Sequence, residues 1–207
     1  EEVTSAAAGA VQAPAGLWFP VPGARLPTSD ENLPGAPRVY RQGVSQGFDF
    51  YSEDAGVPIE HGTPVIAAAN GQVVRADVAF TEMDPRAWEV LITDVEEAGA
   101  DGSQLDDLRG RQVWIRHAGG FVTRYAHLAA VAEIVSVGAR VNQGDIIGTT
   151  GNSGTLEAAQ GTQDDPHPHV EVWQGDTTFL GAGMEPEQIW ELAGQVFGLA
   201  ALPPFHD

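Results

Sequence analysis

Hydrophobic and polar positions alternate over short runs between Tyr40 and Val172, as expected for β-strands that bury one face. The clearest runs are "TPVIAAANGQVVRADV", "RQVWIRHAGGFVTRYAHL", "ARVNQGDIIGTT" and "HPHVEVW". Glycine and asparagine interrupt them, and the pairs "NG" and "GG" between apolar stretches are typical of tight hairpins. The pattern predicts a mainly β fold, with a small antiparallel core.

Two segments show helical periodicity instead. Residues 84–98 begin with an aspartate and a proline, repeat apolar positions at helical spacing and are followed by a glycine. Residues 185–198 repeat apolar positions at i, i+3, i+4, i+7 and i+8. We expect both helices to pack on the β core, and a shorter helical turn at 103–108.

The length of 207 residues suits one domain with additions. Residues 1–16 are small and polar, which predicts a disordered leader or tether. Residues 17–42 are rich in proline and are expected to form an extended segment packed on the core. The domain itself is expected at 43–180, with an insertion at about 81–110 beside its groove. Residues 181–207 then form the C-terminal helix and tail.

Composition excludes several functions. Ten Lys and Arg against 29 Asp and Glu give a formal charge of -19, which disfavours binding to nucleic acid. No apolar run reaches the ~20 residues of a membrane-spanning helix, so no transmembrane segment is expected in this chain. Cysteine is absent, and any metal must therefore be bound by His, Asp and Glu.

Histidines occur in two motifs that could carry chemistry. In "HPHVEVW", His167, His169 and Glu171 share one face if the segment is a strand. Two imidazoles at this spacing lie about 7 Å apart and can serve one metal ion and its reaction centre. In "YAHL", His127 lies on the same face as Tyr125. Taken alone, the first motif favours a pair of surface histidines, and the second motif is also a weak signal.

Taken together and in order, the motifs resemble those of the lysostaphin-like, or LytM-type, zinc endopeptidases. These are peptidoglycan hydrolases of the β-lytic type. The resemblance covers about residues 43–173 and includes "GTPVIAAANGQVV", "VWIRHAGGFVTRYAHL", "VGARVNQGDIIGTTGNSG" and "HPHVEV". It implies a small β core with an open groove, one zinc ion on the groove floor, and a peptidoglycan peptide lying along the groove.

The resemblance also assigns roles to residues. It aligns Asp49 and His169 with two zinc ligands, and His127 and His167 with the two catalytic histidines beside the metal-bound water. The first motif of the family, His-x-Gly-x-Asp, corresponds to "SQGFD". Its histidine, the remaining zinc ligand, is replaced by Ser45.

The serine leaves the enzymatic activity open. Catalytic zinc needs three protein ligands and a position for water, and a neutral serine hydroxyl is a poor donor to zinc. A substitute ligand could come from Asp164 or Asp165, which precede the histidine pair, or from His61. We therefore keep the occupancy of the zinc site open.

Three explanations of Ser45 follow. The chain could be a zinc endopeptidase with a substitute ligand, or a non-catalytic module that binds peptidoglycan or activates a cell-wall amidase. It could also be a protein in which this histidine was deliberately replaced by serine to obtain a stable, inactive form. In each case the resemblance implies a bacterial protein outside the cytoplasm that is secreted, bound to the cell wall or tethered to the membrane. Peptidoglycan peptides are the expected partners, with a cell-wall amidase as a further candidate.

Overall fold

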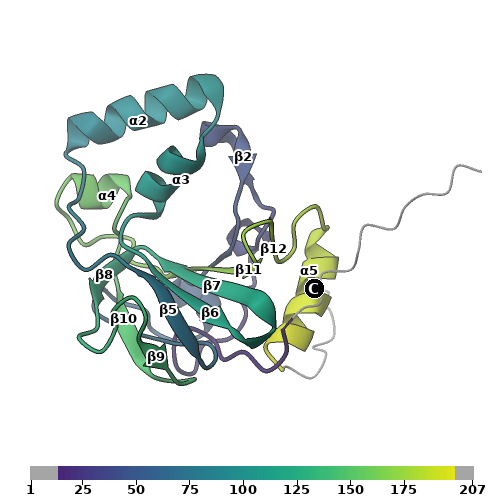
Figure 1. The fold of residues 1–207 in the computed structure, drawn as a ribbon. Helices are drawn as coiled ribbons and strands as arrows, with labels where there is room; N and C mark the ends of the chain where they lie inside the picture. Colours follow the sequence, from purple (N-terminus) through teal and green to yellow (C-terminus); the bar gives the residue numbers. More distant parts are fainter. Residues whose placement is uncertain (1–13, 199–207) are drawn as a thin grey trace, which may run out of the picture.

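The computed structural model describes residues 14–198, which form a β core with helices above it and at its C-terminal end (Figure 1). The strands are β1 (Pro37–Arg38), β2 (Gly43–Val44), β3 (Phe48–Asp49), β4 (Pro64–Ile66), β5 (Gly71–Ala76), β6 (Val113–His117), β7 (Phe121–Ala126), β8 (Leu128–Val131), β9 (Arg140–Val141), β10 (Ile146–Thr150), β11 (His169–Gln174) and β12 (Thr178–Phe179).

The strands form three sheets. The largest has the order β12-β11-β7-β6-β5-β9, and β3 pairs with β11 on the edge opposite β7. The second has the order β4-β10-β8, and β1 pairs with β2. Every pairing is antiparallel, which confirms the predicted fold class.

The structure confirms one of the two predicted hairpins and contradicts the other. The "GG" pair lies between β6 and β7, which are hydrogen-bonded neighbours, as predicted. The "NG" pair does not form a hairpin, because β4 pairs with β10 whereas β5 pairs with β6 and β9. Gly71 instead allows a close approach: a Cβ there would lie 2.6 Å from the carbonyl oxygen of Arg116. The glycine thus serves packing between strands rather than a turn.

The helices are α1 (Ser52–Ala55), α2 (Pro85–Ala98), α3 (Gly102–Arg109), α4 (Leu156–Ala159) and α5 (Pro186–Val196), with short 3-10 turns η1 (Asp30–Asn32), η2 (Val39–Arg41) and η3 (Ala118–Gly120). Helices α2 and α5 confirm the predicted inserted and C-terminal helices, but α2 packs against α3 in a cluster of its own and not on the β core as expected. Helix α3 is longer than the short turn expected at 103–108, because Asp101 and Gln104 form a capping box. No helix within residues 14–198 is long and apolar enough to span a membrane.

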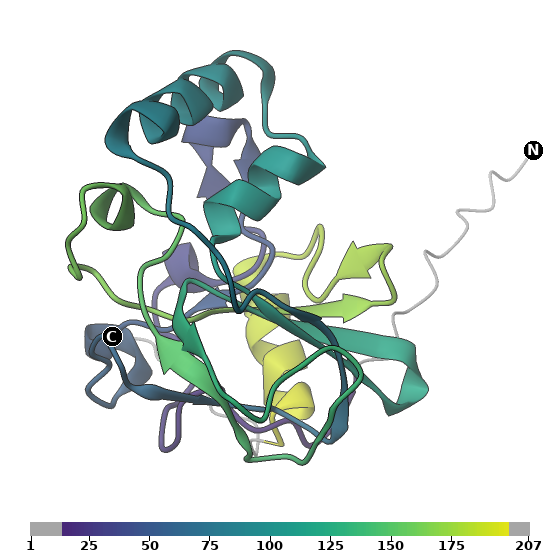
Figure 2. The same ribbon diagram turned by 60° about the vertical axis from the view of Figure 1, so that its left-hand side comes forward.

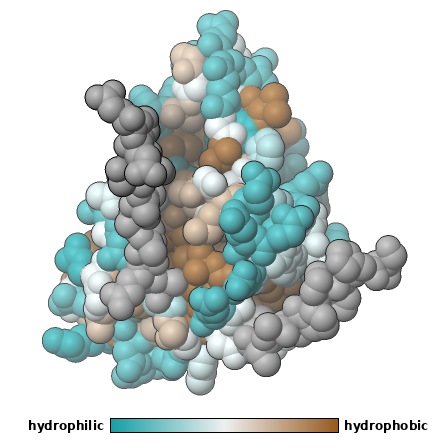
Figure 3. Space-filling view, turned by 90° about the vertical axis from the view of Figure 1, so that its right-hand side faces the viewer, coloured by the Kyte–Doolittle hydropathy of each residue, from teal (hydrophilic) through white to brown (hydrophobic). Residues whose placement is uncertain are grey.

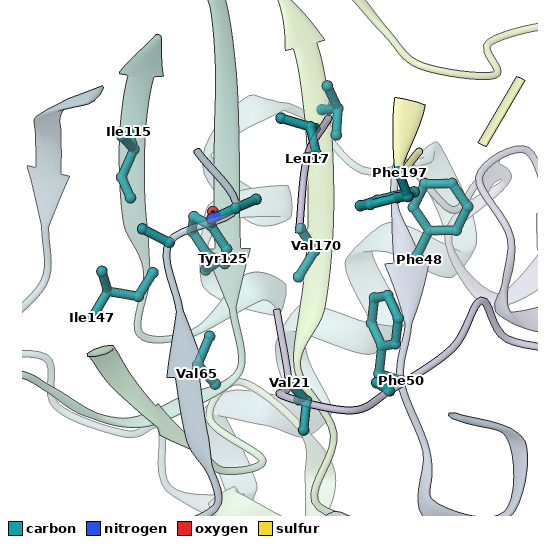
Figure 4. Packing of buried hydrophobic residues seen from close by; sticks show 14 of the residues in the cluster. Leu17, Val21, Phe48, Phe50, Val65, Ile115, Tyr125, Ile147, Val170 and Phe197 are labelled. Atoms are coloured by element: carbon teal, nitrogen blue, oxygen red, sulfur yellow. Dashed lines mark hydrogen bonds between the residues drawn. The ribbon is translucent and has the colours of Figure 1, made fainter. Parts of the chain in front are cut away.

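The main core fixes the strand that carries Asp49. Phe48 and Phe50 on either side of it are fully buried, and Phe48 packs edge-on against Phe197, which follows α5 (Figure 4). Leu17 and Val21, from the N-terminal segment, belong to the same cluster. Aromatic packing therefore holds the backbone of Asp49 in one place.

The insertion stands away from the sheet and has a small core of its own. Helices α2 and α3 lie together above the sheet in both ribbon views (Figure 2), and Leu91, Val95 and Leu108 are buried between them. On the face seen from the right of Figure 1, hydrophobic residues gather in a band that hydrophilic residues flank (Figure 3).

Candidate functional site

The structure brings Asp49 and His169 together on neighbouring strands. The two residues are register partners in β3 and β11, and Asp49 Oδ1 lies 2.5 Å from His169 Nδ1. The other carboxylate oxygen, Oδ2, accepts a hydrogen bond from Arg38 Nη2 at 2.7 Å. Asp49 is thus held between an imidazole and a guanidinium.

A second carboxylate lies on the far side of the same imidazole. His169 Nε2 is 3.2 Å from Glu171 Oε1, and the same oxygen accepts a hydrogen bond from Arg109 Nε at 2.7 Å. Glu171 also accepts a hydrogen bond from Trp173 Nε1. The result is a continuous network of alternating charge whose members are Arg38, Asp49, His169, Glu171 and Arg109.

The network sets the charge of its members. Burial disfavours a charged His169, but the charge of Asp49 and the hydrogen bonds with both carboxylates outweigh it and raise the pKa of His169 to about 9. Burial likewise disfavours an ionised Glu171, yet its hydrogen bond with His169 and the charge of Arg109 lower its pKa to about 2. Against the same desolvation, the charge and hydrogen bond of His169 hold the pKa of Asp49 well below its usual range.

His127 and His167 face each other beside this network, with ring centroids 4.8 Å apart. His127 has a left-handed backbone (φ 56°), and its Nδ1 donates to the carbonyl oxygen of Ser153 at 2.8 Å. Desolvation and the charges of the neighbouring histidines hold its pKa well below the usual range. Its Nε2 therefore keeps a lone pair and can accept a hydrogen bond.

His167 is oriented from both sides. Its Nδ1 donates to the carbonyl oxygen of Asp165 at 2.9 Å, and its Nε2 accepts from the hydroxyl of Tyr51 at 3.1 Å. The rings of Tyr51 and His167 are also stacked, with centroids 4.1 Å apart. His167 itself precedes β11, because Pro168 comes directly before the first residue of that strand.

Ser45 lines the same cavity but is engaged elsewhere. It is 1% exposed, and its hydroxyl donates to the carbonyl oxygen of Gly47 at 3.1 Å. A serine near an Asp and His pair also raises the possibility of a nucleophilic triad. The geometry excludes it, because His169 Nε2 faces Glu171 rather than the serine.

The three candidate substitute ligands are not gathered around Asp49 and His169. Asp164 and Asp165 are both exposed, and Asp165 reaches the site through its backbone carbonyl, which His167 uses. His61 lies in a turn and is not among the residues that line the cavity.

These residues do not fit a zinc ion as they are arranged. Both nitrogens of His169 face carboxylate oxygens, which only accept hydrogen bonds, so both nitrogens carry protons and neither offers a lone pair to a metal. The hydroxyl of Ser45 is used by Gly47, and Asp49 is already paired with Arg38. Within residues 14–198, no three His, Asp or Glu side chains are grouped so that they could hold a metal ion. The expected zinc ligand set is therefore incomplete.

A cavity of about 600 Å³ opens above the network. Its floor contains Asp49, His169 and Glu171, and apolar side chains from the insertion and from α4 form part of its wall: Trp88, Ile92, Leu108 and Leu156. The volume is within the range of ligand-binding pockets, roughly 300–1,000 Å³. The expected groove is thus present, with the insertion as one of its walls.

Sequence reasoning missed several residues of the site, among them Tyr51, which orients His167. Glu171 was placed on the correct face of its strand but received no role. Arg38 lies in the proline-rich segment and Arg109 in the insertion, and neither segment belongs to a motif that points to the site. A charge argument could have found them, since two buried carboxylates need buried cations.

Comparisons with known proteins agree with the resemblance. Residues 90–179 match the sequence profile of peptidase family M23. The chain is 36% identical over 78 residues to the peptidoglycan DD-endopeptidase ShyC of Vibrio cholerae serotype O1; these residues are 36% of this chain and only 16% of ShyC.

Two solved structures can serve as examples of structural similarity. A zinc-containing peptidase from Vibrio cholerae is 24% identical with a TM-score of 0.46, over 77% of this chain and 37% of that one. The catalytic domain of lysostaphin from Staphylococcus simulans is 22% identical with a TM-score of 0.44, over 71% and 79% of the two chains.

The matched segment contains His127, His167 and His169 and begins after Ser45 and Asp49. It also contains β6, β7, β10 and β11, of which β11 contributes His169 and Glu171 to the cavity. Residues 90–179 therefore match the sequence profile of peptidase family M23, a segment that makes up less than half of the chain.

Proposed function

We propose that this domain binds peptides of peptidoglycan in the cavity above Asp49 and His169 and does not hydrolyse them at an appreciable rate. The choice of ligand rests on the M23 profile and on the similarity to ShyC, whose name describes an endopeptidase of peptidoglycan. A peptidoglycan ligand in turn implies that the protein works outside the cytoplasmic membrane of a bacterium.

The proposed loss of hydrolysis rests on the residue at position 45 and on its hydrogen bond. In the family to which this site is compared, this position supplies a histidine to the metal, whereas here a buried hydroxyl donates to the carbonyl oxygen of Gly47. Two candidate ligands remain, one fewer than catalytic zinc requires. No hydrolytic step is therefore assigned to these residues.

The cavity remains suited to binding. Its wall offers an aromatic ring and aliphatic side chains, and its floor offers neutral and charged groups that can orient a peptide. Neither binding nor orientation of a peptide requires the third metal ligand. A cell-wall amidase as a partner stays a prediction, because none of the contacts described above points to a protein partner.

Binding and hydrolysis can be measured on the same material. Purified sacculi are incubated with the protein, sedimented, and assayed both for retained protein and for soluble peptide fragments. We expect retention of the wild type and no release of fragments above the level of a protein-free sample. Hydrolysis comparable with that of an active M23 endopeptidase, or the absence of retention, would contradict the proposal.

A matched pair of variants on one helix tests the site of binding. Trp88 lines the cavity from α2, whereas Val90 on the same helix is 54% exposed and does not line it. Trp88→Ala should weaken retention about tenfold, because a large aromatic contact is worth more than 1 kcal/mol at a binding site. Val90→Ala should bind like the wild type.

A further inference from the structure

Arg38 occupies an unusual place for a residue of the N-terminal segment. Its Nη2 lies 2.7 Å from Asp49 Oδ2 and 3.1 Å from the carbonyl oxygen of Glu31. Its side chain is 20% exposed and lines the cavity together with Ser45. The guanidinium is therefore held by its own segment as well as by the carboxylate.

We infer that Arg38 is the resident cation of this site, and that its guanidinium closes the site to divalent metal ions even when a third ligand is provided. This goes beyond the proposed function, in which the lack of hydrolysis follows from Ser45 alone. It assigns a role to a residue for which the M23 resemblance provides no counterpart.

The first argument is electrostatic. Asp49 is the carboxylate that the resemblance assigns to the metal, and Arg38 already neutralises it at hydrogen-bond distance. A divalent ion on the other carboxylate oxygen would lie a few ångströms from the guanidinium, and like charges at such a distance disfavour each other strongly when they are shielded from water. A metal ion therefore has to displace Arg38 before it can bind.

The second argument concerns the backbone. Strands β1 and β2 pair Arg38 with Gly43, and on the same hairpin the amide of Ser45 donates to the carbonyl oxygen of Ala36 at 2.8 Å. The hairpin thus carries both the serine and the arginine, and backbone hydrogen bonds position both. Exchanging the side chain at position 45 leaves this backbone pairing, and with it Arg38, in place.

The test is the zinc content of desalted protein after incubation with equimolar zinc, measured by plasma mass spectrometry. The variants are Ser45→His, and Ser45→His combined with Arg38→Gln or with Arg38→Met. Arg140→Ala combined with Ser45→His serves as the control, because Arg140 is exposed on β9 and does not line the cavity.

We expect much less than one zinc per chain in the wild type, in Ser45→His and in the Arg140 control. The two combinations that remove the charge of Arg38 should each retain close to one zinc. In a titration with zinc alone they should bind it at least about 100-fold more tightly than Ser45→His, a ratio at the upper end of the effects known for residues that contact metal ligands.

The Ser45→His variant tests whether Arg38 excludes zinc even if the Arg38 variants fail to fold. Close to one zinc per chain retained by that variant after desalting would overturn the role of Arg38. Folded combinations that remain free of zinc would overturn it as well. Neither result bears on the proposed function, because retention on sacculi is measured on the wild type without added metal.

Discussion

Asp49 and His169 are paired twice, once through the backbones of β3 and β11 and once through side chains 2.5 Å apart. They are 120 residues apart in the sequence. Because the strand pairing itself brings them together, the pair does not depend on the residue at position 45. Asp49 does, however, balance the charges of His169 and Arg38. The contribution of this balance can be measured as the free energy of unfolding.

Asp49→Asn should destabilise the fold by about 3–5 kcal/mol, because it leaves the cations of His169 and Arg38 without their buried carboxylate. The measurement is the free energy of unfolding in urea. Asp176→Asn is the control, since Asp176 is 80% exposed and meets Arg124 only at 3.5 Å; it should stay within ~0.5 kcal/mol of the wild type. A similar loss in both variants would show that the network at Asp49 contributes no more than a surface pair.

A second prediction concerns the glycine between Ser45 and Asp49. A Cβ on Gly47 would lie 2.7 Å from the carbonyl carbon of Val170 in β11, so Gly47→Ala should push the two strands apart and cost about 1–3 kcal/mol.

The matched control for this exchange is Gly102→Ala at the start of α3, where a Cβ meets nothing within 4 Å. Alanine is the better helix former there, so this variant should be neutral or more stable by up to about 1 kcal/mol. Equal unfolding free energies for the two variants would refute the close approach at Gly47.

Sequence reasoning could predict the elements whose signals are local. Helix α2 follows from an N-cap aspartate, whose side chain accepts from the amide of Ala87 at 2.8 Å, and from regular apolar spacing. The groove histidines follow from ordered motifs. The pairing of β4 was missed, because an "NG" pair is equally a turn signal and a site of close strand approach.

The charge network could not be predicted for a different reason. Arg38 meets Asp49 only because β1 and β2 form a hairpin beside β3, and Arg109 meets Glu171 across 62 residues. Neither contact leaves a periodic pattern in the sequence. The assembled fold decides where a single long side chain lies. In the sequence, only the carboxylates expected to be buried indicate that a cation must lie near them.

A third prediction uses pH and lies outside the groove. His117 is 6% exposed, its Nδ1 donates to the carbonyl oxygen of Asn70 at 2.9 Å, and its Nε2 lies 2.7 Å from the hydroxyl of Thr123. Burial lowers its pKa, although the hydrogen bond with Asn70 opposes this. The folded chain therefore binds a proton less readily at His117 than the unfolded chain does.

The sign of the effect follows from this difference. As pH falls below about 6.5, the unfolded chain takes up a proton that the folded chain resists, so stability should fall between pH 7 and 5. His117→Gln should reduce this slope, while Arg116→Gln, an exposed neighbour on the same strand, should keep it. Urea unfolding at several pH values measures both. Equal slopes for the wild type and His117→Gln would refute the assignment.

The last prediction asks what holds the insertion over the groove. Arg109, at the end of α3, donates to Glu171 in β11 and to the side chain of Gln46, so one guanidinium joins the insertion to the groove floor. Arg109→Met removes this link and leaves Glu171 with less compensation, which should cost about 3–5 kcal/mol.

The exchange Arg109→Met should lower the local stability of the insertion as well as the global stability of the fold. Hydrogen exchange should accelerate most in α3, which keeps the cluster with Leu108 and the ion pair of Asp106 with Arg75, while β5 and β6 change only as far as global stability does. Arg116→Met, which removes an exposed arginine from β6, controls for the loss of charge and should leave both regions unchanged. If α3 exchanges no faster in Arg109→Met than the sheet does, the insertion is held by its other contacts, and the arginine serves only to neutralise Glu171.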